Sequence, residues 1–78
     1  MMHKLLDTVA LTADHLEVGL RKGDVGAVVE VLGQDTYEVE FVAASGRTQA
    51  LVTLAAGEVR ALGDSDLISV RSLAETEA

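Results

Sequence analysis

Residues 37–42 read Tyr-Glu-Val-Glu-Phe-Val, and their apolar and acidic side chains alternate with a period of two. This period is typical of a β-strand that buries one face and exposes the other. Glu38 and Glu40 are therefore expected on the outer face, and the aromatic and valine side chains between them on the core face. The same alternation recurs along most of the chain, so the sequence predicts an all-β fold.

Period-two alternation predicts five strands separated by glycine-containing turns. They are expected over Leu5–Ala13, Val25–Leu32, Tyr37–Val42, Thr48–Leu54 and Leu67–Ser72. In the second strand, Val25, Val29 and Val31 are predicted to share the core face. Residues Ala55–Leu62 lack alternation, and we expect a short helix or a 3-10 turn there, capped by Thr53.

Five short strands, a long early loop over residues 14–23 and a helical turn before the last strand favour a small antiparallel barrel of the SH3-like type. Gly23 and Gly26 suit the tight bends of such a barrel. The alternative is a five-stranded barrel of the oligonucleotide-binding type, which needs a helix where the short Ser45-Gly46 link stands. We expect one domain over residues 1–73 and a frayed acidic tail over 74–78.

A two-residue turn at Ser45-Gly46 would fix how the third and fourth strands pair, because glycine adopts a positive φ without steric cost. It places Ala44 opposite Arg47. Farther from the turn, the predicted core-face pairs are Phe41 with Ala50, Val39 with Val52 and Tyr37 with Leu54. Pattern and turn therefore agree on one register.

The register of the preceding hairpin follows from keeping the valines of the second strand on the core face. The predicted cross-strand pairs are Val31 with Val39, Val29 with Phe41, Glu30 with Glu40 and Leu32 with Glu38. Like charges directly opposite each other destabilise a sheet by up to about 1 kcal/mol. The sequence therefore predicts a repulsive glutamate pair on the outer face.

Carboxylates and apolar side chains gather on this predicted outer face. The predicted partner-binding residues are Val28, Glu30, Glu38, Glu40, Val42 and Leu51. An acidic cluster with apolar residues among it has the composition of a surface for another protein. Alternatively, the stretch Leu67–Leu73 or an identical subunit covers these residues, or the exposed valines are ordinary surface residues.

Six Lys and Arg residues against 13 Asp and Glu residues give a formal net charge of −7. This charge disfavours nucleic acid and anionic membrane surfaces and is compatible with a basic protein partner. Acidity that only keeps a small protein soluble is the alternative. The chain has no apolar run of about 18 residues that could span a membrane. It also has no signal-peptide pattern, so a cytoplasmic location is expected.

Catalytic and metal-binding constellations are missing from the sequence. The chain has no Cys, which excludes disulfides, thiolate zinc sites and cysteine nucleophiles. His3 and His15 lack metal-ligand spacing, and Glu38 and Glu40 lie on an open face instead of in a cleft. A barrel of this size leaves no interior room for a substrate pocket. We therefore expect a non-enzymatic protein that needs no metal and no cofactor.

Residues 22–31, Lys-Gly-Asp-Val-Gly-Ala-Val-Val-Glu-Val, resemble the KOW motif. That motif is found in SH3-like barrels of ribosomal proteins and transcription elongation factors. The resemblance implies an accessory protein of the ribosome or RNA polymerase. Such an accessory would make contact through Arg21, Lys22 and the long loop.

A longer resemblance covers Leu5 to about Leu62. It rests on the stretches 5–11, 19–31, 37–42 and 50–54. In them the chain resembles a family of small bacterial proteins catalogued as a domain of unknown function, whose expected fold is an SH3-like barrel. Its members are often short acidic chains, and some look like one half of a two-gene pair. The resemblance thus implies a partner protein and names no catalytic residue.

Taken together, these features predict a non-enzymatic SH3-like barrel that binds another protein. In the most concrete form, it is an acidic accessory or antitoxin-like subunit that masks or positions a more basic partner. The carboxylates would steer the partner, and the valines with Leu51 would supply most of the binding energy. The alternatives are the KOW-like accessory role and a structural protein that self-associates as a homodimer.

Overall fold

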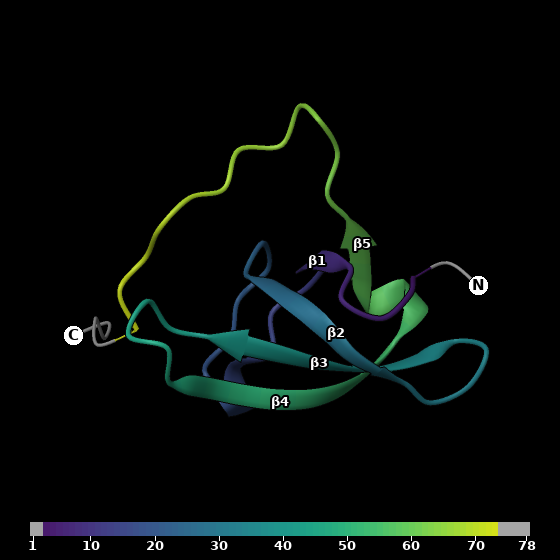
Figure 1. The fold of residues 1–78 in the computed structure, drawn as a ribbon. Coiled ribbons are helices and arrows are strands. Elements are labelled where there is room, and N and C mark those ends of the chain that lie inside the picture. The colour runs from purple at the N-terminus through teal and green to yellow at the C-terminus, as the bar shows by residue number, and fades with distance from the viewer. Residues whose placement is uncertain (1–2, 74–78) are drawn as a thin grey trace.

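The structure, a computed structural model, describes residues 3–73 and contains five antiparallel strands in one sheet (Figure 1). The strands are β1 Thr8–Leu11, β2 Val25–Val31, β3 Thr36–Val42, β4 Thr48–Ala55 and β5 Val59–Ala61. Two single-turn 3-10 helices, η1 Leu16–Val18 and η2 Ala56–Glu58, lie between strands. The predicted fold class is confirmed: all-β, five antiparallel strands and a 3-10 turn before the last strand. The predicted tail over 74–78 lies outside the described residues.

The sheet order is β4-β3-β2-β1-β5, so the last strand returns to the free side of the first. β3 and β4 are joined by a tight turn without a helix, unlike the oligonucleotide-binding alternative. One face of the curved sheet packs into an aliphatic core around two aromatic rings. The core consists of Val9, Leu11, Leu20, Val28, Tyr37, Val39, Phe41, Leu54 and Val59. No helix within residues 3–73 is long and apolar enough to cross a membrane.

The β3–β4 hairpin has the register that the sequence predicted along most of its length. Tyr37 lies opposite Leu54, Val39 opposite Val52 and Phe41 opposite Ala50, as predicted. Strict alternation on both strands makes this register easy to predict, because a one-residue slip would expose every core side chain.

The turn of this hairpin is one residue longer than predicted. The N–H of Ala43 donates to the Arg47 carbonyl at 2.9 Å, which leaves three residues in the loop. Gly46 has a φ of +91°, the left-handed conformation that glycine supplies at the end of such a loop. The longer loop shifts the pairing, so Val42 lies opposite Thr48. The predicted pair of Ala44 with Arg47 is therefore wrong.

A β-bulge in β2 changes the register of the preceding hairpin. Val28 lies opposite Val39, whereas Glu30 lies opposite Glu38 and Val31 opposite Tyr37, with a shift between Val28 and Glu30. The extra residue at a bulge reverses which face the following residues occupy. Strict alternation cannot represent this reversal. The predicted pairs Val31 with Val39, Val29 with Phe41, Glu30 with Glu40 and Leu32 with Glu38 are therefore wrong.

The bulge also moves Val28 from the predicted outer face into the core. Its side chain is fully buried, and Val31 packs against the same core after the bulge. Nearby, β2 approaches β3 closely at Gly26, where a Cβ would lie 2.8 Å from the Glu40 carbonyl oxygen. Only glycine fits at this position.

The fifth strand comes earlier in the chain than predicted. β5 pairs with β1, with Val9 opposite Ala61, and Val59 is buried in the core. The predicted strand Leu67–Ser72 is not a strand, and the side chains of Leu67 and Val70 are 93% and 97% exposed. The last strand of the sheet is β5, which lies beside β1.

The turn before β5 begins differently from the prediction. The N–H of Ala55 donates to the Glu58 carboxylate at 2.8 Å, which closes η2 over a single turn. Thr53 does not cap this turn, because its hydroxyl donates to Glu38. β1 is also shorter than predicted, beginning only after Leu6 takes a φ of 72°.

Candidate functional site

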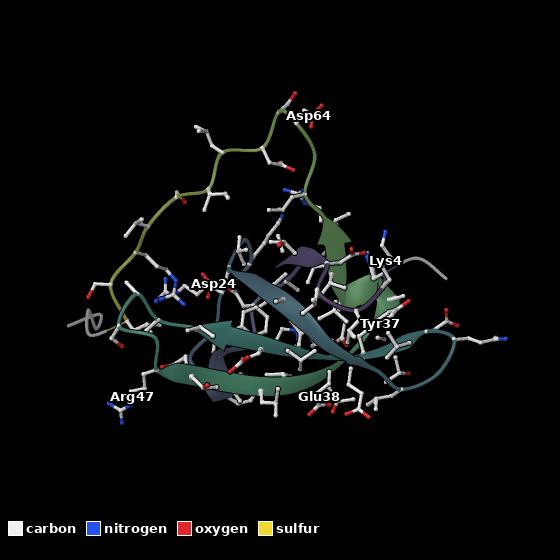
Figure 2. The ribbon with its side chains drawn as sticks, viewed as in Figure 1. Lys4, Asp24, Tyr37, Glu38, Arg47 and Asp64 are labelled. Atoms are coloured by element: carbon white, nitrogen blue, oxygen red, sulfur yellow. The ribbon has the colours of Figure 1, made fainter. Side chains whose placement is uncertain are left out.

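Two glutamates on the outer face of β3 have their carboxylates held over β4. The Thr53 hydroxyl donates to Oε1 of Glu38 at 2.7 Å, and the Thr48 hydroxyl donates to Oε2 of Glu40 at 2.6 Å. Figure 2 shows Glu38 on the opposite side of β3 from Tyr37, which points into the core. The threonine hydroxyls therefore orient both carboxylates toward the outer strand of the sheet.

Glu30 adds a third carboxylate to this surface. It is exposed on β2 directly opposite Glu38. Among residues 3–73, no Lys or Arg forms an ion pair with Glu30, Glu38 or Glu40. The negative charge of the three carboxylates is thus left for solvent or for a partner.

An exposed leucine lies beside these carboxylates. Leu51 lies opposite Glu40 in the β3–β4 pairing, and its side chain is 56% exposed. Glu30, Glu38, Glu40 and Leu51 together are called the acidic face below. Val42, also predicted for the site, is exposed at the end of β3, whereas Val28 is in the core and belongs to no surface. Sequence reasoning missed Thr48 and Thr53, although the predicted register of Tyr37 with Leu54 places Thr53 opposite Glu38.

Residues 62–73 form an extended strap that leaves β5 and returns to the other end of the sheet (Figure 1). At its start, Arg60 donates two hydrogen bonds to Asp66, at 2.9 and 3.0 Å. At its end, Arg71 donates to both carboxylate oxygens of Asp24, at 2.9 and 2.6 Å, and to the Gly19 carbonyl at 3.0 Å. The strap is therefore attached by an ion pair at each end.

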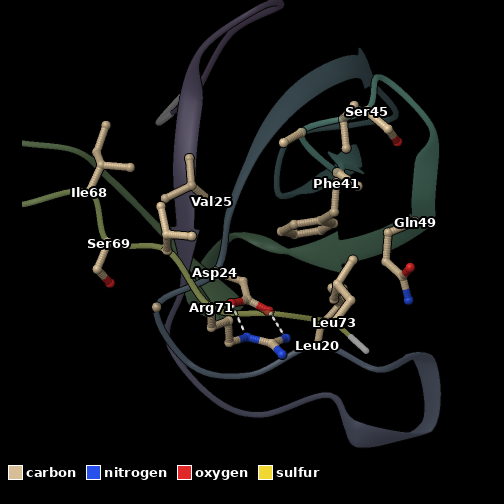
Figure 3. Close-up of a pocket in the computed structure, with 15 residues that line it drawn as sticks. Leu20, Asp24, Val25, Phe41, Ser45, Gln49, Ile68, Ser69, Arg71 and Leu73 are labelled. Atoms are coloured by element: carbon tan, nitrogen blue, oxygen red, sulfur yellow. Dashed lines mark hydrogen bonds and ion pairs between the residues drawn. The ribbon is translucent and has the colours of Figure 1, made fainter. Parts of the chain in front are cut away.

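A hollow of about 560 Å³ opens between the strap and the sheet (Figure 3). Leu20, Val25 and Phe41 line it from the domain, and Ile68 and Leu73 line it from the strap. The hollow lies at the end of the sheet and not within the hydrophobic core. The strap borders this hollow and leaves Leu51 exposed, so the stretch Leu67–Leu73 does not cover the acidic face.

The Arg71–Asp24 contact changes the acidity of the carboxyl group. Burial alone would raise the pKa of Asp24, but hydrogen bonds from the Arg71 side chain and the Arg21 backbone, with the charges of both arginines, lower it below 3.8. Asp66 has its pKa lowered to about 2, mainly by the hydrogen bonds from Arg60 and from the Gly63 backbone. Both carboxylates are therefore charged at neutral pH.

The two histidines lie in different surroundings. His3 is 4% exposed, its ring packs edge-on against Tyr37 at 5.2 Å, and neither ring nitrogen has a hydrogen-bond partner. His15 has one ring nitrogen 3.8 Å from Glu17 and the other 3.8 Å from Glu58. Within the described part of the chain, no three His, Asp or Glu side chains are grouped as a metal site would require.

Residues 5–61 match the family model described as "Domain of unknown function (DUF4926)". The chain belongs to the DUF4926 family. The predicted resemblance to a domain of unknown function is thereby confirmed. No curated protein and no solved structure matches the chain. The DUF4926 match spans all five strands and the acidic face, and the strap lies beyond it.

Proposed function

We propose that this DUF4926 protein is a non-enzymatic binding module that holds a basic partner protein against its acidic face. The observation that carries the proposal is the cross-strand pair of Glu30 and Glu38. A like-charged pair destabilises the sheet by about 0.2–1 kcal/mol, and a cationic partner would relieve that repulsion. Leu51 offers apolar contact area beside the charges.

In this role the carboxylates steer and orient the partner, while Leu51 and Val42 contribute contact area. The threonine hydroxyls reduce the freedom of Glu38 and Glu40 before binding, which lowers the entropy lost on association. We further propose that the sheet is an SH3-like barrel and that the protein is a bacterial, cytoplasmic accessory or antitoxin-like subunit, which masks or positions its partner.

Affinity capture from the native cell, followed by binding kinetics with the purified partner, tests this proposal. The double variant Glu38→Lys with Glu40→Lys should slow association and leave folding nearly unchanged. Glu17→Lys with Asp64→Lys changes net charge equally at exposed positions outside β2, β3 and β4, and is the matched control. Equal association rates for the two double variants would contradict the proposal.

The same capture separates the alternative functions. A single stoichiometric basic protein supports the accessory role. Ribosomal proteins or RNA polymerase subunits would instead favour the KOW-like role through Arg21 and Lys22, and RNA binding by that route should weaken steeply with salt. Recovery of the protein alone would favour self-association.

A further inference from the structure

β4 is an edge strand that lacks the usual protection against pairing with another chain. In natural proteins, an edge strand is usually prevented from pairing with another chain because it is short or contains charged side chains, proline or a bulge. β4 has eight residues, Thr-Gln-Ala-Leu-Val-Thr-Leu-Ala, with no charged residue, proline or glycine. Its one register shift lies near the start, and from Ala50 to Ala55 its pairing with β3 is regular. The opposite edge strand, β5, has three residues and carries Arg60.

The direction of the free backbone groups of β4 follows from Ala55. Its N–H donates to the Glu58 carboxylate at 2.8 Å, and thus points away from β3. Backbone direction in a strand repeats every two residues, so the N–H groups of Thr53 and Leu51 also point away from β3. Within residues 3–73, no segment pairs with this edge. β4 therefore presents a row of backbone donors and acceptors to solvent.

The acidic face lies within reach of a strand added at this edge. Glu38 and Glu40 lean over β4, where they accept hydrogen bonds from Thr53 and Thr48. An added strand would lie about 4.8 Å beyond β4, and the long side chain of Lys or Arg can reach back over β4 to the carboxylates. The two glutamates are two residues apart on β3, the spacing at which side chains recur on one face of a strand.

We propose that the basic partner binds by adding a strand to the β4 edge, with Lys or Arg at alternate positions facing Glu38 and Glu40. This inference rests on the proposed function and specifies how the partner is held. Backbone hydrogen bonds would supply affinity, and the alternating cations would supply specificity. A second copy of this chain fits less well, because β4 has no basic residue and each chain carries a net charge of −7.

The test uses a synthetic peptide as long as β4 in which lysine alternates with valine, titrated into the isotope-labelled full chain. Amide exchange at Leu51 and Thr53 should slow about tenfold or more at saturating peptide. Leu51→Pro removes one outward N–H, which an edge strand tolerates on its solvent side, and should weaken binding about tenfold. Leu51→Thr also loses the leucine side chain but keeps the N–H, so the roughly tenfold difference expected between Leu51→Pro and Leu51→Thr measures the lost backbone hydrogen bond alone.

A second probe avoids any doubt about folding of the proline variant. In this probe, the backbone nitrogens of the same peptide that would face β4 are methylated. The methylated peptide cannot donate backbone hydrogen bonds to β4 and should bind at least about tenfold more weakly. Unchanged exchange at Leu51 and Thr53, or equal binding of the methylated and unmethylated peptides, would overturn strand addition.

Glutamine variants separate this proposal from the proposed function. If Glu38→Gln with Glu40→Gln abolishes peptide binding while Leu51→Pro does not, the acidic face binds cations without an added strand. The proposed function then stands, and strand addition is wrong. If neither the glutamine variant nor Leu51→Pro changes peptide binding, both the proposed function and strand addition are wrong. A dimer of the protein alone, with slow exchange at Leu51 and Thr53, would identify a second copy as the occupant and also overturn the proposal.

Discussion

Glu30 on β2 lies directly opposite Glu38 on β3, so two carboxylates of the same charge form a cross-strand pair. The bulge after Val28 creates this pair, because it moves Glu30 into register with Glu38. Glu38 also accepts a hydrogen bond from Thr53. Repulsion between Glu30 and Glu38 thus lowers the stability of the sheet at the surface where the partner is proposed to bind.

Reversing the charge of Glu30 should stabilise the isolated protein. Glu30→Lys replaces repulsion with attraction toward Glu38 and should raise the free energy of unfolding by about 0.5–1 kcal/mol in low salt. Urea denaturation measures this, and Glu30→Gln should give a smaller gain. The gain should shrink as salt is added. A loss of stability in low salt would show that the two carboxylates do not repel each other as argued.

Gly26→Ala should destabilise the sheet. The added Cβ would lie 2.8 Å from the Glu40 carbonyl oxygen, the Phe41 ring and the Val39 side chain, so β2 and β3 would have to separate. We expect a loss of about 1–3 kcal/mol in the free energy of unfolding. Gly33→Ala is the control, because nothing lies within 4 Å of its added Cβ. Equal stabilities of the two variants would contradict the close approach at Gly26.

His3→Phe should stabilise the protein. Phenylalanine keeps the edge-on packing against Tyr37 and removes two buried nitrogens that have no hydrogen-bond partner. A buried unsatisfied polar group costs about 1–3 kcal/mol, so the melting temperature should rise. Tyr37→Phe is the comparison. It removes only long contacts, 3.4 Å to the His3 N–H and 3.5 Å to the Gln34 carbonyl, and should have little effect. A less stable His3→Phe variant would mean that the imidazole has a polar partner.

Arg71→Met should release the end of the strap without unfolding the sheet. The change removes the ion pair with Asp24 and the hydrogen bond to the Gly19 carbonyl. Hydrogen exchange and limited proteolysis should then become faster over residues 62–73, while β1 to β5 keep their protection. Lys22→Met, which removes an exposed cation from the neighbouring loop, should leave the strap unchanged.

Acid should release the strap of the unmodified protein as well. The pKa of Asp24 is below 3.8 and that of Asp66 is about 2 in the folded chain. A lowered pKa means that each carboxylate contributes stability above its ordinary pKa, and this contribution is lost as pH falls through the folded value. Strap exchange should therefore accelerate between about pH 4 and pH 2. In Arg71→Met, the part of this change that depends on Asp24 should disappear.

The parts of the fold that sequence could predict are those with uninterrupted alternation. The pairs of Tyr37 with Leu54 and Val39 with Val52 were predicted because both strands alternate strictly around a glycine turn. The register of β2 was not predicted, because three-dimensional packing decides where a bulge forms. Here that packing is the burial of Val28 and the close approach of β2 to β3 at Gly26.

The last strand could not be predicted from the sequence for a different reason. β5 has three residues, which is too short for alternation to be visible, whereas Leu67–Ser72 alternates but lies in the strap and pairs with no strand. At the candidate site, alternation placed Glu38, Glu40 and Leu51 on the outer face. The contact of Arg71 with Asp24 and the packing of His3 against Tyr37 have no local sequence signal, because each joins residues that are far apart in the chain.

The pairing of β1 with β5 brings together the two ends of residues 5–61, the segment that matches the DUF4926 model. Val9, near its start, lies opposite Ala61, its last residue. A unit with adjacent ends can be spliced into a surface loop of a host protein without stretching the host's backbone. By the same geometry, a circular permutant of residues 5–61, in which these two ends are joined and the chain is opened between Ser45 and Gly46, would keep every strand neighbour that the segment has now.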